Sequence, residues 1–370
     1  MKKLIPASVA ALALLACTSA EGTAREVKHG SLAARPTANG KLAYSSSSGA
    51  RHPFYLYAVN QDGSGRRILA RCRSRDCQIG AYAWSPGGKR LAFLRGVLGG
   101  NLSLFVVRAD GTRERRLTGC GKPKWPSCSV RTFFGWLSWS PDGSRLVVAR
   151  NGSLFIVNVN RRSFRRLTSC GRAASCFDAD PFWAPRGARI VFVRGGSIYS
   201  VKTDGSDLTR LTNLTGYAAH PVWSPDGRRI AFDVSGEGEG DKVYAMAADG
   251  SELTLLSSGP IGSGPGRPLW SPDGTQVVFF STPGSPGAFS AEVWVIKADG
   301  SEPRRLYQGS CCIGTWAAPI WSPDGRYIAF GVGSLYPDQF PSGIFIIRTD
   351  GTQLRKLTTD VEEVAWQRKP

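Results

Sequence analysis

Short apolar runs with alternating polar positions recur along most of the chain, and turn-forming residues bound each run. A β-branched run follows a tryptophan and a turn at 90–93, 145–148, 189–192, 229–232, 276–279 and 327–330. A second run, such as Ser197–Val201, comes next, followed by an Asp-Gly pair and a short segment such as Arg115–Thr118. Four short strands separated by turn signals predict one antiparallel blade of a propeller.

A tryptophan phrase marks each repeat. Trp-Ser-Pro-Asp-Gly begins at Trp139, Trp223, Trp270 and Trp321, with altered copies at Trp84 and Trp183 and a last tryptophan at Trp366. Successive tryptophans are 40 to 55 residues apart, a period typical of propellers and solenoids. Because Pro and Gly suit a type I turn and Asp-Gly suits a hairpin, we interpret the aspartates as turn residues rather than metal ligands. We expect the tryptophans to pack between blades.

The chain ends supply one shared blade. Lys41–Tyr44 matches a second strand that lacks a tryptophan strand before it, and Glu363–Trp366 matches a first strand with nothing after it. Pairing them completes the ring and leaves no open edge. We therefore predict an all-β fold, a seven-bladed β-propeller of four-stranded antiparallel blades over residues 41–366, closed by its N- and C-terminal strands.

These residues resemble the TolB-type, WD40-like β-propeller family, whose repeat is Pro-x-Trp-Ser-Pro-Asp-Gly followed by an Asp-Gly hairpin. The resemblance covers residues 41–366 and implies the propeller fold, whereas function must be argued from a site. TolB resembles a two-domain protein, and we expect no counterpart of its N-terminal domain here.

The N-terminal residues predict export. Lys2 and Lys3 precede a short apolar segment over 4–16, which is too short to span a bilayer, so we assign 1–20 as a signal peptide. Residues 14–17 resemble a lipobox that ends at Cys17, the predicted lipidation site, while 18–20 offer an ordinary cleavage site. Residues 21–40 are interpreted as a flexible tether and 367–370 as a tail. Both processing routes place the protein in the periplasm or at the cell surface.

Eight further cysteines fall into four local pairs between successive blades. Export favours disulfides, and neither Cys-x-x-Cys spacing nor nearby histidines indicate a metal site. We predict three bridges and leave open whether the adjacent fourth pair is bridged: Cys72–Cys77, Cys120–Cys128, Cys170–Cys176 and Cys311–Cys312.

Strand alternation places these cysteines on one face of the ring. Connections between blades, and between second and third strands, emerge on that face, and several are long. Long connections on a rigid scaffold concentrate binding residues, so we expect a binding loop over 119–135 that contains Lys122, Lys124, Trp125 and Arg131. Neutral drift of loop length is the alternative explanation.

Charge is distributed unevenly along a chain of formal charge +19. Residues 41–175 hold 24 Lys and Arg against 5 Asp and Glu, whereas 176–370 hold 18 against 21. The excess indicates a protein or anionic envelope partner, such as lipid head groups, a cell-wall polymer or an acidic protein. The alternative explanation for the excess is that arginines on the outer strands discourage pairing between sheet edges of different molecules. The sequence has no nucleic-acid recognition motif, and we expect a monomer that contacts membrane only through a lipid anchor.

The sequence shows no Gly-x-Ser-x-Gly nucleophile elbow, phosphate loop or His-x-x-x-His pair, and we predict no cofactor and no metal. Residues three positions before each tryptophan are equivalent and should converge at the mouth of the channel. Four of them carry polar chemistry and form the candidate binding site: Asp180, His220, Arg267 and Glu363. The alternative is that these charges only neutralise one another across water and bind no ligand.

We therefore expect an exported, non-enzymatic propeller scaffold that binds its partner through the long-loop, disulfide-stapled face. One alternative is a propeller-type lyase or hydrolase that uses the channel-mouth residues. The other is an accessory propeller resembling that of prolyl-oligopeptidase-type proteases, which would work with a separate partner.

Overall fold

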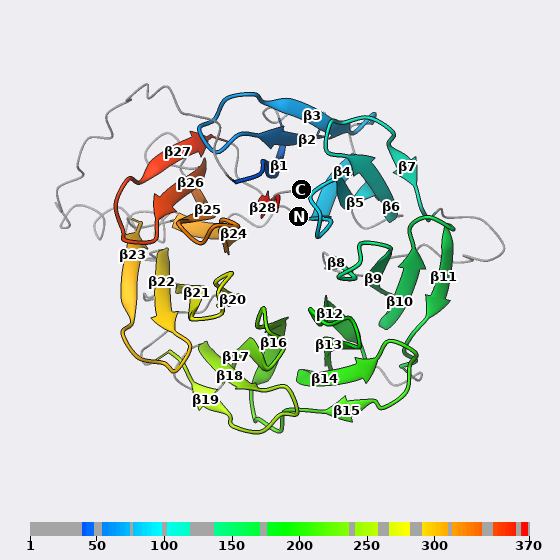
Figure 1. Cartoon of the computed structure of the whole chain (residues 1–370), viewed down its shortest axis with the longest axis vertical. Helices are drawn as coiled ribbons and strands as arrows, with labels where there is room; N and C mark the ends of the chain where they lie inside the picture. Colours follow the sequence, from blue (N-terminus) through cyan, green and yellow to red (C-terminus); the bar gives the residue numbers. More distant parts are fainter. Residues whose placement is uncertain are drawn as a thin grey trace, which may run out of the picture.

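The strands form seven four-stranded antiparallel sheets arranged as blades around a central channel (Figure 1). The computed structural model describes residues 39–47, 54–74, 77–97, 102–118, 137–170, 176–236, 241–257, 266–281, 291–309, 313–334, 343–359 and 364–368. The predicted signal peptide, most of the tether and Cys17 lie outside these residues. The prediction of an all-β, seven-bladed propeller is confirmed for the described chain.

The strands of each blade are given from the channel outward. Blade 1 contains β28 (Val364–Trp366), β1 (Leu42–Ser47), β2 (Phe54–Val59) and β3 (Arg67–Arg71), and blade 2 contains β4 (Cys77–Trp84), β5 (Arg90–Val97), β6 (Leu102–Arg108) and β7 (Arg115–Arg116). Blade 3 contains β8 (Leu137–Trp139), β9 (Arg145–Arg150), β10 (Ser153–Asn158) and β11 (Ser163–Arg166), and blade 4 contains β12 (Asp178–Trp183), β13 (Arg189–Arg194), β14 (Ser197–Lys202) and β15 (Thr209–Arg210). Blade 5 contains β16 (Tyr217–Trp223), β17 (Arg229–Ser235), β18 (Lys242–Ala247) and β19 (Thr254–Leu255). Blade 6 contains β20 (Leu269–Trp270), β21 (Gln276–Ser281), β22 (Glu292–Lys297) and β23 (Arg304–Gln308), and blade 7 contains β24 (Ile313–Trp321), β25 (Tyr327–Ser334), β26 (Gly343–Arg348) and β27 (Arg355–Thr358).

The repeated tryptophans hold neighbouring blades together. All seven are buried, with no more than 8% of any of them exposed. Three indole N–H groups donate to a carbonyl of the preceding blade, in the pairs Trp139–Ala83, Trp270–Val222 and Trp321–Leu269. The arginine that begins a second strand also covers the tryptophan of the next blade, as Arg145 does at 5.1 Å from the Trp183 ring. The prediction that these tryptophans form blade-packing core is confirmed.

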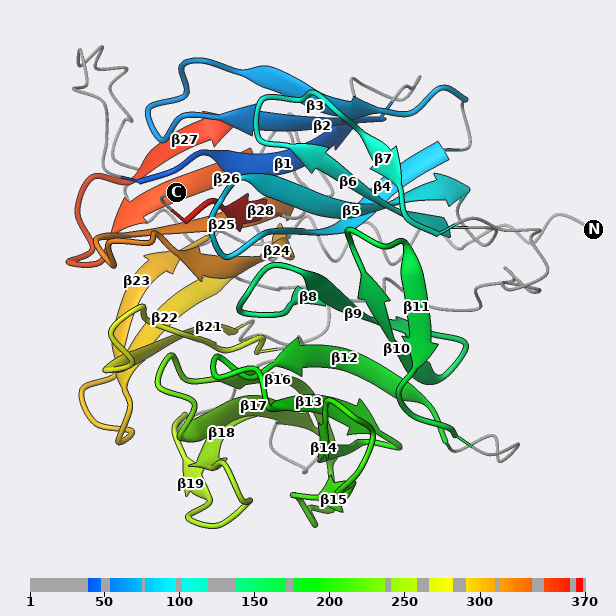
Figure 2. The same cartoon turned by 45° about the vertical axis from the view of Figure 1, so that its right-hand side comes forward.

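The two chain ends close the ring in blade 1. Strand β28 pairs antiparallel with β1, with Ala365 opposite Ala43, and the two strands lie side by side in both views (Figures 1 and 2). Gln367 reinforces the closure, because its side-chain oxygen accepts from the Lys41 N–H at 2.7 Å and its Nε2 donates to the Gly88 carbonyl at 2.6 Å. One side chain therefore joins the C-terminal segment to blades 1 and 2.

The turn aspartates cap their own backbone, as the sequence predicts. In the Ser-Pro-Asp-Gly turn of blade 3, the Gly143 N–H donates to the Ser140 carbonyl at 2.8 Å, and Asp142 accepts from the Ser144 N–H at 3.0 Å. Hydrogen bonds from Ser140 and Ser144 lower the pKa of Asp142 to about 2. Gly143 has a φ of +65°, a conformation that favours glycine and explains its place in the phrase.

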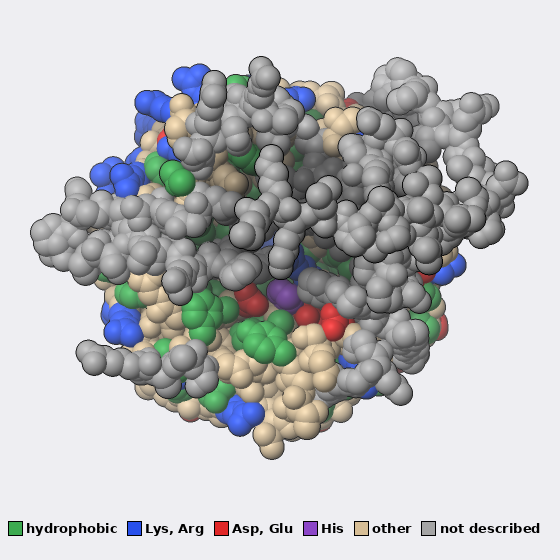
Figure 3. Space-filling model, turned by 180° about the vertical axis from the view of Figure 1, so that it is seen from behind, with side chains coloured by type: hydrophobic (Ala, Val, Ile, Leu, Met, Phe, Trp, Pro, Cys, Tyr) green, Lys and Arg blue, Asp and Glu red, His purple; other side chains and the backbone are tan. Residues whose placement is uncertain are grey.

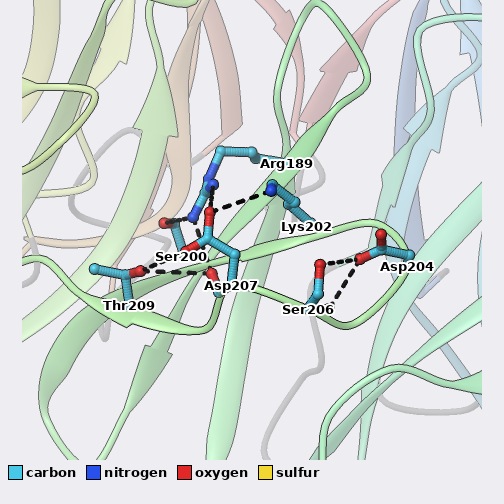
Figure 4. A network of polar contacts seen from close by, with 7 residues as sticks. All are labelled: Arg189, Ser200, Lys202, Asp204, Ser206, Asp207 and Thr209. Carbon is cyan, nitrogen blue, oxygen red and sulfur yellow. Dashed lines mark hydrogen bonds and ion pairs between the residues drawn. The ribbon is translucent and has the colours of Figure 1, made fainter.

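The hairpin of blade 4 shows the second kind of turn (Figure 4). Asp204 accepts from the backbone N–H of Ser206 at 2.8 Å and from its hydroxyl at 2.7 Å. Next to it, Arg189 donates to the Asp207 carboxylate at 2.6 Å and to the Ser200 hydroxyl at 2.9 Å. These carboxylates are occupied by structural hydrogen bonds, which agrees with their interpretation as turn residues.

The outer-strand arginines also make structural contacts. One set donates to a carbonyl in the Asp-Gly turn region of the next blade, in the pairs Arg67–Asp110, Arg165–Asp204, Arg304–Thr349 and Arg355–Gln61. Another set joins the outer strand to a serine that begins or lies near the third strand of its own blade, in the pairs Arg116–Ser103, Arg166–Ser153 and Arg210–Ser197. Part of the basic excess in the first three blades therefore has a structural role.

Strand order gives the ring two different faces. We call the face with the Ser-Pro-Asp-Gly and Asp-Gly turns the turn face. The opposite face, where second strands end and first strands begin, is called the loop face and is the side seen in Figure 3. No helix in the described parts of the chain has the length and apolar character needed to cross a membrane.

Candidate functional site

The residues three positions before the tryptophans occupy a distinctive backbone conformation. Four of the five described ones have a positive φ: Ala81 at 40°, Asp180 at 47°, His220 at 49° and Arg267 at 40°. The pairing register shifts at three of these points, between Gly80 and Tyr82, Ala179 and Phe182, and Ala219 and Val222. A β-bulge turns a side chain away from the regular strand alternation, and a non-glycine residue in this region costs about 1–3 kcal/mol. Such strain often marks functional sites.

His220 forms an ion pair with a residue on the neighbouring strand. Its Nδ1 lies 2.9 Å from Oδ1 of Asp233 on β17, and the side chains are 17% and 3% exposed. Burial disfavours the imidazolium, but the charge and hydrogen bond of Asp233, together with Asp180, raise the pKa of His220 above its usual value. The pair therefore favours a protonated imidazole at the mouth of the channel.

Asp180 reaches this pair from blade 4. Its carboxylate accepts a hydrogen bond from the backbone N–H of His220. Burial, with a contribution from the Asp233 charge, raises the pKa of Asp180 although His220 and Arg267 act in the opposite direction. The charge of Asp180 in turn contributes, after burial, to a raised pKa of Tyr217. Blades 4 and 5 thus share one electrostatic cluster.

Arg267 adds a third blade. It precedes β20 and lines a cavity of about 70 Å³ in the ring, together with Ala81, Tyr82, Leu137, Ala318, Ile320 and Val364. The preceding Gly266 packs closely on blade 5, because a Cβ at that position would lie 2.9 Å from Cγ2 of Val243 and 3.4 Å from Cβ of Asp233. This close approach brings Arg267 beside Asp180 and His220.

Asp241 is a third acidic or basic group near the pair, after Asp180 and Arg267. It immediately precedes β18 and is 9% exposed. Burial and the Asp233 charge raise its pKa to about 6, against the opposing effect of His220. Figure 3 shows the histidine and acidic side chains gathered near the middle of the loop face, beside exposed hydrophobic side chains.

Two residues of the cluster, Asp233 and Asp241, are not among those predicted from sequence. A signal for Asp233 was available, because this charged residue interrupts an apolar run. The equivalent position of the other second strands is uncharged in every case: Ser45, Leu94, Ala149, Val193, Phe280 and Gly331. A charged residue inside such a run indicates a paired or functional group. Asp241 had no comparable signal, because it follows a polar connection.

The structure brings three of the four predicted channel-mouth residues together, namely Asp180, His220 and Arg267. Glu363, and the predicted loop residues Lys122, Lys124, Trp125 and Arg131, lie outside the described residues. Disulfides join Cys72 to Cys77 and Cys170 to Cys176, as predicted. The pairs Cys120–Cys128 and Cys311–Cys312 lie outside the described residues.

One further group in the described chain has metal-ligand residue types. Cys170, Cys176 and Asp178 bring their ligand atoms within 4.8 Å of one another. The two sulfur atoms form the disulfide, so they are not thiolate ligands. Arg194 binds both oxygens of Asp178, at 2.6 and 2.8 Å, and Thr168 also donates to it. This group is therefore a structural ion pair beside a disulfide.

Comparisons with known proteins agree with the fold. The sequence profile described as the TolB beta propeller domain matches residues 128–317. A search of curated proteins gave no match. TolB from Acinetobacter baumannii has a TM-score of 0.54 at 19% identity, over 89% of this chain and 66% of that one.

Two enzymes that contain a similar propeller were also found. A manganese-bound oligogalacturonate lyase has a TM-score of 0.58 at 15% identity, over 86% of each chain. A prolyl endopeptidase has a TM-score of 0.61 at 13% identity, over 86% of this chain and 48% of that one. At these identities the likeness concerns the fold alone.

Proposed function

Because the chain belongs to the TolB β-propeller domain family, we propose that it is an exported, non-enzymatic scaffold that binds a partner through its loop face. The observation that carries this proposal is the convergence of Asp180, His220 and Arg267 from three blades, each in a left-handed backbone conformation. Fixed polar groups at the opening of a rigid ring suit the recognition of a partner. The partner is a protein or an anionic envelope component, in keeping with the basic first three blades.

Exposed aromatic side chains on the loop face support a protein partner. Phe177 and Tyr217 come at equivalent positions in blades 4 and 5, six residues before their tryptophans, and are 39% and 53% exposed. Aromatic residues and arginine are enriched where protein interfaces gain most of their binding energy. The loop face carries both kinds of residue.

The raised pKa of His220 favours binding over proton abstraction. A general base must be unprotonated at working pH, whereas the ion pair with Asp233 raises the pKa of this imidazole and so opposes that state. A protonated histidine instead supplies a hydrogen-bond donor to a partner.

Site-specific crosslinking tests the proposal. A photo-crosslinking amino acid at Phe177 or Tyr217 in the producing cell should yield one discrete adduct. The matched controls are Leu208 and Leu253, which are 46% and 45% exposed and lie next to turn-face hairpins. An adduct at all four positions, or at none, would contradict binding through the loop face.

Location, lipidation and oligomeric state belong to the same proposal. Fractionation should place the protein in the periplasm or at the cell surface, and light scattering should give a monomer. Mass spectrometry of the mature N-terminus distinguishes a lipid on Cys17 from cleavage after residue 20. A cytoplasmic protein with an intact N-terminus would contradict export.

A second candidate function is a lyase that uses the channel mouth. The His220–Asp233 pair beside Arg267 is the observation that favours it, since a base and a carboxylate-binding cation suit elimination from an acidic sugar. Incubation with oligogalacturonate and detection of an unsaturated product tests this function. Turnover that His220→Ala abolishes would favour the lyase over the scaffold.

A further inference from the structure

Two of the six turns that follow the repeated tryptophans lack the usual aspartate. Blade 2 has Gly87 at this position and blade 4 has Arg186. The other four turns keep the residue, as Asp142, Asp226, Asp273 and Asp324. In both altered turns the glycine N–H still donates to the carbonyl three residues earlier, at 2.8 Å, and a Cβ at Gly87 would meet nothing within 4 Å. The backbone of the turn is therefore kept, and at Gly87 lack of space does not explain the missing carboxylate.

The hairpin that joins β10 to β11 in blade 3 lacks a third carboxylate. The other six hairpins between third and fourth strands contain an Asp-Gly pair, whereas this one has Asn160, Arg161 and Arg162. The Asn158 side chain accepts from the N–H groups of Asn160 and Arg161, at 3.1 and 2.8 Å. A neutral amide thus caps this hairpin where carboxylates cap the others. Blades 2, 3 and 4 each lose one turn carboxylate in this way.

The turns of these three blades pack against one another. A Cβ at Gly143 in blade 3 would lie 3.7 Å from Cδ of Pro86 in blade 2. A Cβ at Gly187 in blade 4 would lie 3.7 Å from Cδ of Pro141 in blade 3. The same three blades follow one another around the ring in Figure 1. The altered turns therefore lie along one continuous part of the turn face.

Two further contacts bring the blade 3 hairpin and the C-terminal segment to the same place. Arg90 of blade 2 donates to the Gly143 carbonyl at 2.7 Å and to the Asn160 side chain at 3.4 Å. A Cβ at Gly88 would collide with the carbonyl oxygen of Arg368. The positive side chains of the hairpin and of the C-terminal segment thus lie next to the altered turns.

Five exposed cations lie on these turns or beside them, and we call them the basic strip: Lys89, Arg161, Arg162, Arg186 and Arg368. Within the described residues none of the five forms an ion pair, whereas turn-face cations in blades 5 and 6 are paired, Arg228 with Asp226 and Lys297 with Glu302. The carboxylate that remains in these turns, Asp142, is hydrogen-bonded to both serines of its own turn. The strip therefore carries positive charge that the structural contacts of the other arginines do not explain.

Two other features of the turn face favour a lipid surface as the partner. Leu208 lies next to the Asp-Gly hairpin of blade 4 and is 46% exposed, and apolar side chains on a polar surface enter the head-group region of a bilayer. The described chain also begins on this face, where the Asn39 side chain accepts from the Asp324 N–H at 3.2 Å. A soluble acidic polymer would make no use of either feature.

The charges at the tips of adjacent turns present a broad surface rather than a pocket. Arginine binds phosphate through two hydrogen bonds, and each cation near an anionic membrane contributes about fivefold in affinity. We propose that the basic strip binds the phosphate groups of anionic phospholipids and holds the turn face against a membrane. This inference goes beyond the partner binding proposed above, and it leaves the loop face directed away from the bilayer. It adds a direct electrostatic contact to the lipid anchor predicted at Cys17.

Vesicle binding by the full chain tests this site, with Cys17→Ala to exclude an acyl chain from the measurement. The probes are phosphatidylcholine vesicles with and without phosphatidylglycerol. We expect co-sedimentation with the anionic vesicles, weakened by salt, and little with the neutral ones. Equal binding to both kinds of vesicle would overturn the proposal. Equally tight binding of soluble poly-glutamate or polyphosphate would overturn it in favour of an acidic polymer.

Restoring the repeat removes positive charge while keeping the turns. Gly87→Asp combined with Arg186→Asp lowers the charge of this region by three units and supplies the carboxylate that caps the other turns. We expect vesicle binding to weaken by about tenfold or more, with an unchanged or higher melting temperature. Arg161→Gln combined with Arg162→Gln should also weaken binding by about tenfold or more.

The matched control removes the same charge elsewhere on the ring. Arg71→Gln combined with Arg73→Asp also lowers the charge by three units, at exposed positions at and just after the loop-face end of β3. This pair should leave vesicle binding unchanged. Parent-like binding by both strip variants, or an equal loss in the control, would overturn the proposal.

Crosslinking at Phe177 separates this inference from the proposed function. If anionic vesicles do not bind while the Phe177 adduct forms, the membrane site is wrong and the scaffold function stands. If the repeat-restoring variant loses vesicle binding and keeps the adduct, the membrane site and the loop face act as separate surfaces. If vesicles bind as described and no adduct forms, the proposed partner binding is wrong.

Discussion

The imidazole Nδ1 of His220 lies 2.9 Å from Oδ1 of Asp233, at the bulge in β16 where this strand pairs with β17. The two residues are 13 positions apart and belong to adjacent strands of one blade. Their contact places a charged pair in a propeller interior that is otherwise mostly apolar. Asp180 and Arg267 also act on the pKa of His220, and the charges of Asp233 and His220 act on the pKa of Asp241, so we expect the channel mouth to respond to pH.

We expect Asp233→Asn to lower the pKa of His220 and to destabilise the protein most at mildly acidic pH. A histidine whose folded pKa is raised contributes stability that is fully present below its unfolded pKa of about 6.5 and is lost as pH rises through the folded pKa. A hydrogen bond to a charged group is worth about 1.5–3 kcal/mol, so the loss at pH 5.5 should be of that order. Urea unfolding at pH 5.5 and 9, with NMR titration of His220, checks this; an unchanged His220 pKa in the variant would contradict it.

The turn aspartates should stabilise the fold above pH 4. Asp142→Ala removes hydrogen bonds that lower the pKa of this carboxyl to about 2. Because the folded pKa is depressed, the stabilisation is present above the unfolded value of about 3.9 and is lost as pH falls through the folded pKa. We expect a loss of about 1 kcal/mol at pH 7 that shrinks towards pH 2. Denaturant unfolding across this range measures it, and a pH-independent difference would be the wrong outcome.

Ring closure should depend on Gln367. Gln367→Ala removes the hydrogen bonds to the Lys41 N–H and the Gly88 carbonyl. Gln367 itself is only 7% exposed. We expect a loss of about 2–3 kcal/mol because two buried backbone groups lose their partner. Gln308→Ala, at an exposed position on β23, is the matched control. Thermal unfolding compares them, and equal melting temperatures would argue against this closure.

The bridge between Cys170 and Cys176 should stabilise blade 4 modestly. It closes a loop with a sequence separation of 6, for which the loop-entropy model gives about 2 kcal/mol. The double variant Cys170→Ser, Cys176→Ser should lose that amount and still fold, because the blades have a large apolar core. Mass spectrometry with and without reductant establishes the bridge, and unfolding gives its contribution. A protein isolated with both thiols free would refute the prediction.

Gly266 should control the position of Arg267. Gly266→Ala places a Cβ 2.9 Å from Cγ2 of Val243 and 3.4 Å from Cβ of Asp233, so the segment must shift. We expect a cost of about 1–3 kcal/mol and a changed His220 NMR signal. Gly87→Ala is the control, since nothing lies within 4 Å of a Cβ there. An unchanged His220 signal in Gly266→Ala would separate Arg267 from the cluster.

Local chemistry made the blade predictable from sequence. Each Trp-Ser-Pro-Asp-Gly phrase contains its turn, its turn-capping aspartate and its blade-packing tryptophan within five residues. The strand that follows is recognised from its own alternation. Such information is carried by neighbours in the chain, and four full phrases, two altered ones and the last tryptophan together indicate seven blades. The shared blade was also predictable, because Lys41–Tyr44 and Glu363–Trp366 each match one part of the repeat.

The channel mouth was only partly predictable. Repeat position alone identified Asp180, His220 and Arg267 as equivalent residues, because equivalent positions in a closed ring face the same axis. Asp233 and Asp241 do not occupy that position. Asp233 meets His220 beside the bulge in β16, and the packing of Gly266 on Val243 and Asp233 brings the segment with Arg267 to the same place. The sequence by itself therefore determined the blades, their number and the closure of the ring, through turns and core residues that act locally. Only the tertiary structure decided which charges pair at the mouth, because those relationships depend on distances between strands and between blades.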